Sequence, residues 1–266
     1  MIFNESEYIR IPVGDYSIGI SPMVLDTAIG ALKEGAVRSE FLANACPEHV
    51  VHVDDVFIRK TLATYRDFLA FAQDTGYLTE GERQGWGWIW QDGRWQKKSG
   101  VSWRCPFGTS DDKRYRNNDD MPVMQVSWND AAAYCAWFSG RAGRSARLPR
   151  EAEWEVFAGI SGVCGMGDWA RGTSDPPPKP NLLEAIRELP GGSGHATGLL
   201  WEWVDDWYDR YPGGSDHRDF GTVYKVLRGG SVLSLPVQKT REFRLRKCPT
   251  ARSPYYGFRV ACFVNH

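Results

Sequence analysis

Tryptophan and glycine constrain the fold of this chain more than any other residues. The 266 residues include 12 Trp and 28 Gly. A buried indole removes a large apolar area from water, and glycine lets the backbone adopt positive φ values that other residues avoid. Together they predict a loop-rich fold in which buried indoles hold irregular segments, without long uninterrupted helices.

Length and charge exclude several classes of protein. A chain of 266 residues with 42% hydrophobic residues can bury a full core, and we treat residues 1–266 as a single domain. A net charge of -1 gives no overall attraction to nucleic acid or to an anionic membrane surface. No apolar run approaches the roughly 20 residues needed to span a bilayer, and the first residues lack the pattern of a signal peptide. We therefore expect a cytoplasmic protein, with its oligomeric state left open.

The six cysteines are spread along the chain without a Cys-x-x-Cys pair. This spacing argues against a zinc ribbon or a thioredoxin-like site, and cytoplasmic cysteines are normally reduced. Cys135 lies among Ala and aromatic residues on a predicted helix, so we expect it in the core. The pattern assigns no role to Cys105, Cys164, Cys248 or Cys262.

Periodicity predicts three helices of about ten to fifteen residues. The first is capped by Thr61 or Thr64 and ends near Gly76, where a left-handed residue is favoured. The second begins at Ser127, with Asp130 placed to complete the cap. The third begins at Pro149, because proline lacks only an N–H that a first helical turn does not use.

The remaining segments predict strands and loops. Alternating polarity indicates paired strands in residues 8–19 and 49–60, and residues 22–45 allow a short helix. Trp86, Trp88 and Trp90 alternate onto one side of a strand that leads into an Asp-Gly hairpin turn. Gly and Pro predict a long surface loop over residues 172–198, followed by short strands to residue 264.

Several ordered motifs give the chain a family resemblance. They read PEHVVHVD at 47–54, PVMQVSW at 122–128, RLPREAEWE at 147–155, WEW at 201–203, VLRGGS at 226–231 and GFRVA at 257–261. In this order they resemble the formylglycine-generating enzyme (sulfatase-modifying factor) family over residues 8–264. The resemblance implies an α+β fold with an elaborated C-type-lectin-like core, low regular secondary structure and about three short helices.

The catalytic chemistry that the resemblance implies is not matched by the residues. The family oxidises a substrate cysteine with copper held by two thiolates in the segment after Gly-Gly-Ser. Counted without gaps, those two positions are Ser234 and Lys239. Neither a hydroxyl nor an ammonium is a soft anionic ligand for Cu(I), so the sequence argues against a thiolate-bound copper.

Calcium and other metals have weak candidates. The resemblance implies a calcium site whose usual Asn is Leu199 in this chain, although Glu202 is retained. An apolar side chain offers no oxygen to a hard cation. Asp205 and Asp206 follow closely and are weak metal candidates together with Glu202, but a solvated acidic loop is the preferred interpretation.

A basic stretch follows the Gly-Gly-Ser motif. By resemblance, Arg228, Arg241 and Arg259 are scaffold residues that tie loops to carboxylates and carbonyl groups. The other cations predict a pocket for an anionic small molecule or an acidic peptide, with ligand-binding candidates Lys239, Arg244, Arg246, Tyr255 and Tyr256. The catalytic candidates are Ser234, Lys239, Cys248 and His195, the last in a glycine-rich loop. Their order reveals no Ser-His-Asp or Cys-His arrangement.

Three function classes stay open. The first is a divergent enzyme of this family that performs an oxidative or tailoring step on a peptide or an anionic small molecule. The second is a ligand-binding module of the retroelement variable-protein type, which carries variable residues between Arg-Gly-Gly-Ser and Gly-Phe-Arg. The third is a partner domain that keeps the fold without chemistry, because one fold supports many functions.

Overall fold

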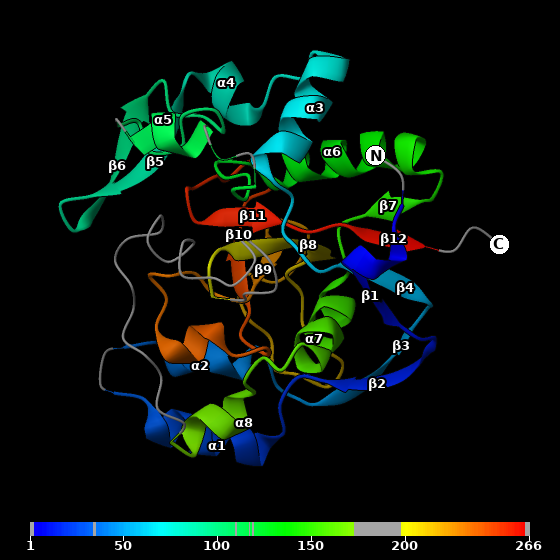
Figure 1. The fold of residues 1–266 in the computed structure, drawn as a ribbon. Helices are drawn as coiled ribbons and strands as arrows, with labels where there is room; N and C mark the ends of the chain where they lie inside the picture. Colours follow the sequence, from blue (N-terminus) through cyan, green and yellow to red (C-terminus); the bar gives the residue numbers. More distant parts are fainter. Residues whose placement is uncertain are drawn as a thin grey trace.

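The computed structural model describes residues 3–33, 36–109, 111–116, 118, 120–172 and 198–263. Over these residues the chain is a mixed α+β structure with short elements joined by loops, as expected (Figure 1). None of the described helices is both long and apolar enough to cross a membrane.

One four-stranded sheet joins the two ends of the chain. Its order is β1 (Tyr8–Ile11), β4 (Val56–Arg59), β12 (Ala261–Phe263) and β7 (Ala146–Arg147), and every pair is antiparallel. The two-stranded pair β2 (Gly14–Ile18) and β3 (His49–Val53) is also antiparallel, and two helices lie between its strands in the sequence. The C-terminal strand β12 is therefore an inner strand whose neighbours come from the first and middle parts of the sequence.

A second four-stranded sheet carries the family motifs. Its order is β10 (Leu245–Lys247), β9 (Lys225–Arg228), β8 (Trp201–Trp207) and β11 (Tyr256–Phe258). Strand β11 runs parallel to β8, and the other pairs are antiparallel. Trp203, in the middle of β8, is fully buried and donates its indole N–H to the carbonyl of Val126 at 3.1 Å. Buried indoles thus connect separate segments, as the composition predicted.

The three predicted helices are confirmed. Helix α3 (Tyr65–Thr75) has a capping box formed by Thr64 and Asp67. Helix α6 (Trp128–Ala142) has one formed by Ser127 and Asp130. Helix α7 (Glu151–Ile160) starts two residues after the predicted Pro149.

The expected number of about three helices is wrong, because the described residues contain five more. Residues 22–45 hold α1 (Pro22–Ala31) and α2 (Ser39–Ala43). The others are α4 (Glu80–Gln84), α5 (Asp111–Arg116) and α8 (Met166–Ala170). Helices of five or six residues complete fewer than two turns, so they show no apolar period in the sequence.

The predicted tryptophan hairpin is present as β5 (Trp86–Gln91) and β6 (Arg94–Ser99). Its turn has Asp92 at φ 53° and Gly93 at φ 72°, which fits the two-residue hairpin turn expected of Asp-Gly. Register pairs Trp90 with Trp95 and Trp88 with Lys97, so these side chains lie on one face. Figure 1 shows the hairpin extending from the body of the molecule beside α4 and α5.

Candidate functional site

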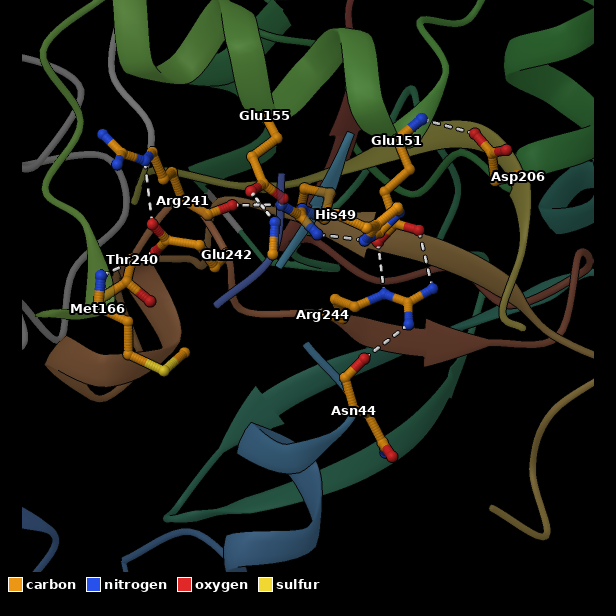
Figure 2. Close-up of polar contacts among 12 residues, drawn as sticks. Asn44, His49, Glu151, Glu155, Met166, Asp206, Thr240, Arg241, Glu242 and Arg244 are labelled. Carbon is orange, nitrogen blue, oxygen red and sulfur yellow. Dashed lines mark hydrogen bonds and ion pairs between the residues drawn. The ribbon is translucent and has the colours of Figure 1, made fainter. Parts of the chain in front are cut away.

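A buried network of charges joins residues on either side of the Gly-Gly-Ser segment to helix α7. Arg228, at the end of β9, is fully buried and donates to Glu151 Oε1 at 2.8 Å and to Glu155 Oε2 at 2.5 Å. Arg244 forms a two-bond pair with Glu151, at 2.6 and 2.8 Å, and donates to the carbonyl of Asn44 (Figure 2). Breaking one partner of such a buried pair typically costs 3–5 kcal/mol, on the order of half a domain's stability.

The network sets the ionisation of its carboxyl groups. Burial opposes the charge of Glu151, but the guanidinium groups of Arg244 and Arg228 outweigh it and lower the pKa of that carboxyl. Burial, and then the negative charge of Glu151, raise the pKa of Asp206 to about 6. The Asp206 carboxylate accepts the backbone N–H of Glu151 at 2.5 Å and so caps the start of α7.

The weak metal candidates have other roles in the structure. Glu202 is fully buried, accepts two bonds from Arg259 at 2.5 and 2.7 Å, and accepts the indole N–H of Trp154 at 2.8 Å. Asp205 lies 3.9 Å from the ammonium of Lys225. With Leu199 apolar and buried, these residues do not fit a calcium ion. Within the described ranges, no group of three or more His, Cys, Asp or Glu side chains is placed to hold a metal.

The catalytic candidates in the described residues have different surroundings. Ser234 is buried, and its hydroxyl accepts the backbone N–H of Ser231 at 2.9 Å. Lys239 is half-buried, and its side-chain carbons lie over Gly230 and Gly198. Cys248 is exposed just after β10. His195 falls outside the described residues.

The ligand-binding candidates also have different surroundings, and some of them are already bound to other side chains. Arg244 is buried in its pair with Glu151, which removes its guanidinium from any ligand surface. Arg246 is paired with Asp219 and lies over the Phe41 ring at 4.9 Å. Tyr255 contacts the ring of Trp95, with ring centres 5.8 Å apart. Of the predicted set, Tyr256 lines the open cleft described next.

That cleft lies between the tryptophan hairpin and the segment that joins β10 to β11. It encloses about 310 Å³ and is lined by Trp88, Trp95, Lys247, Ala251, Arg252, Ser253 and Tyr256. Trp88 and Trp95 remain 39% and 45% exposed, so their rings are accessible from the cleft. We call this cavity the aromatic cleft.

Two side chains, Gln125 and Arg252, hold the hairpin against the rest of the molecule. The side-chain amide of Gln125 donates to the carbonyls of Trp88 at 2.6 Å and Pro106 at 3.0 Å. Arg252 donates to the carbonyl of Trp86 at 2.7 Å and lies over the Trp86 ring at 4.3 Å. The walls of the aromatic cleft are therefore fixed in place from both sides.

The lining of the aromatic cleft is positively charged. It contains the cations Lys247 and Arg252 and no carboxylate among the described residues. Trp88 lies on the hairpin and Lys247 lies in the basic stretch after Gly-Gly-Ser, and no sequence motif links the two. The hairpin turn was visible in the sequence, whereas the path of residues 247–256 across its face was not.

A second cleft, of about 220 Å³, lies between the start of α1, helix α8 and residues 241–242. Burial, and then the charge of Glu155, raise the pKa of Glu242 at this cleft. Glu242 accepts the backbone N–H of Met166 at 2.8 Å and the side chain of Arg241 at 3.0 Å (Figure 2). Its lining mixes cations with carboxylates, so its charge selects no class of ligand.

Comparisons with known proteins agree with the motifs and the fold. The sulfatase-modifying factor enzyme 1-like domain matches residues 3–263. The formylglycine-generating enzyme of Streptomyces coelicolor is 30% identical over 300 residues, covering 95% of this chain and 88% of the relative. The inactive C-alpha-formylglycine-generating enzyme 2 of Mus musculus is 30% identical over 241 residues, covering 74% and 72%.

A solved structure shows the same fold. The structure of PvdO from Pseudomonas aeruginosa has a TM-score of 0.61 at 20% identity and covers 99% of this chain and 98% of its own. Sequence motifs, fold and the match over nearly the whole length lead to one conclusion. The chain belongs to the sulfatase-modifying factor enzyme 1-like family, the family of the formylglycine-generating enzymes.

Proposed function

We propose that this protein is a divergent member of its family that binds an anionic peptide or small molecule in the aromatic cleft and carries out a tailoring step on it. The observation that carries the proposal is the lining of this cleft, three aromatic rings and two cations without a carboxylate. Concave sites with apolar walls and a few fixed polar groups are typical of ligand sites.

The proposal does not use a two-thiolate copper. The Ser234 hydroxyl is buried in a hydrogen bond to the backbone of its own turn, and Lys239 covers two glycines with its carbon chain. A hydroxyl and an ammonium do not fit a soft Cu(I) ion, so no step is assigned to that metal. The six cysteines are free thiols, which supports the proposal that the protein works in the reducing cytoplasm.

The binding part is tested by calorimetry with aspartate- and glutamate-rich tetrapeptides and with small carboxylates. We expect Lys247→Gln to weaken binding at least tenfold, because it removes a cation from the cleft and keeps the length of the stem. Lys33→Gln is the matched control, since Lys33 is exposed just after α1, and Figure 1 shows α1 at the opposite end of the molecule from the hairpin. Equal loss in both variants, or binding of neither ligand class to the wild type, rejects the proposed site.

The catalytic part needs its own measurement. Bound ligands are incubated with the protein in air and analysed by mass spectrometry, together with oxygen consumption. A mass change that disappears in Lys247→Gln and persists in Lys33→Gln supports turnover at this site.

The second candidate is ligand binding without chemistry, as a binding module or partner domain. The specific observation in its favour is that a relative named inactive is as similar, at 30% identity, as one named an enzyme. Tight binding in the aromatic cleft with no mass change and no oxygen consumption selects this candidate over the enzyme.

A further inference from the structure

We infer that the ligand of the aromatic cleft is a small planar monoanion, an aromatic acid, rather than an acidic peptide. The inference rests on the proposed function and adds the chemical class of the ligand. It follows from three features of the cleft: the kind of walls, the number of available cations, and the size.

The walls are flat and held in place. Trp95 is fixed by edge-to-face contacts with Trp90, at 5.3 Å between ring centres, and with Tyr255, at 5.8 Å. Trp88 has an edge-to-face contact with Trp86 at 5.7 Å. Because these rings are already ordered, a planar ligand stacks on them without ordering the side chains first.

The two cations differ in how many hydrogen-bond donors they have available. Four of the five N–H bonds of Arg252 are directed at protein acceptors: two at the carbonyl of Trp86, one at Gln84 at 3.1 Å and one at the carbonyl of Thr250 at 3.4 Å. Lys247 is exposed, and its ammonium has no hydrogen bond or ion pair to any described residue. Lys247 therefore binds the acid group directly, and Arg252 contributes its positive charge to the lining.

The electrostatic setting of Lys247 agrees with this assignment. Partial removal from water, and then the neighbouring charge of Arg246, lower the pKa of its ammonium. A carboxylate against Lys247 offsets both effects, because an opposite charge favours the ionised form of the amine. One ammonium with free donors matches one negative charge on the ligand.

The size favours a small molecule. A volume of about 310 Å³ is at the lower end of the range of roughly 300–1,000 Å³ for ligand pockets. Ala251 and Ser253 keep the space between the aromatic walls open because their side chains are short. Such a space accepts one fused ring system with its acid group, whereas an extended peptide requires a longer groove.

The test uses three probes of one shape: 2-naphthoate, its neutral amide 2-naphthamide, and the saturated decahydronaphthalene-2-carboxylate. Calorimetry on the full chain is expected to show 2-naphthoate binding at least tenfold tighter than either of the others. Lys247→Gln is expected to remove the preference for acid over amide. Trp88→Leu is expected to remove the preference for the aromatic over the saturated ring.

The controls separate this inference from the proposed function. Lys33→Gln keeps both preferences, and unchanged thermal unfolding shows that each variant is folded. If acidic tetrapeptides bind in a Lys247-dependent way and 2-naphthoate does not, the cleft is a peptide site and the inference is overturned while the proposed function stands. If neither peptides nor carboxylates bind, both are rejected.

Discussion

Several arginines of this protein are buried, and each of them binds carboxylates or carbonyl groups of other segments. Arg228 and Arg259 were expected to tie loops to carboxylates and carbonyl groups, and both are confirmed in that role. Arg244 was expected at a ligand surface, but it is buried against Glu151. The sequence shows that these residues are cations. It does not show that Arg244 binds the carboxylate of Glu151, which lies 93 positions away in the sequence.

Asp206 provides a prediction at this scale. Its folded-state pKa of about 6 lies about two pH units above its ordinary value of 3.8, a difference of about 3 kcal/mol. The folded state keeps this proton as the pH rises from about 4 to 6, whereas the unfolded state releases it, so the wild type loses stability over that window. Asp206→Asn keeps an oxygen that accepts the Glu151 N–H and does not titrate.

The free energy of unfolding of Asp206→Asn minus that of the wild type is therefore expected to rise by about 2 kcal/mol between pH 4.5 and pH 7.5. Urea unfolding at both pH values measures it. A difference that does not change with pH contradicts the raised pKa of this carboxyl group.

At the scale of elements, caps and apolar periodicity identified helices of several turns. Alternating polarity identified strands. Helix α4 was missed although Thr79 and Glu82 form a capping box that is legible in the sequence. The hairpin was predicted, but its orientation depends on Gln125 and Arg252, which bind its carbonyl groups from separate segments. Local patterns contain no information about such partners.

Gly87 tests how closely the hairpin packs. A Cβ at this position lies 2.5 Å from Val101 Cγ1, and the branched valine has little freedom to move. Gly87→Ala is expected to cost about 1–3 kcal/mol by overpacking. The double variant Gly87→Ala/Val101→Ala is expected to cost less than the sum of the single variants, because removing the Cγ atom relieves the contact. Strict additivity in urea unfolding would show that the hairpin shifts away instead.

At the scale of the whole molecule, the sheet β1-β4-β12-β7 joins distant parts of the chain. Strand β12 pairs with β4 on one side and with β7 on the other, and Ala261 and Cys262 on it are fully buried. This sheet is therefore complete only after residues 261–263 have been synthesised.

Truncation measures this dependence. A chain that ends after Val260 lacks β12 and is expected to lose cooperative thermal unfolding, because β4 and the edge strand β7 both lose their partner and the apolar residues beneath become exposed. A chain that ends after Phe263 keeps the strand and is the control. Cooperative unfolding of the shorter chain near the temperature of the control contradicts the central place of β12.

Sequence motifs and local patterns were enough to identify the family, the α+β class, the three predicted helices and the tryptophan hairpin. These depend on motifs and on interactions within a few residues, which periodicity and capping reveal. Tertiary structure decided which cations are buried and which face a cavity, because that depends on how residues 247–256 cross the hairpin and on carboxylates brought from α7. Tryptophan and glycine predicted that loops would be held by indoles, but only the folded chain shows that Trp88 and Trp95 are left partly exposed beside Lys247.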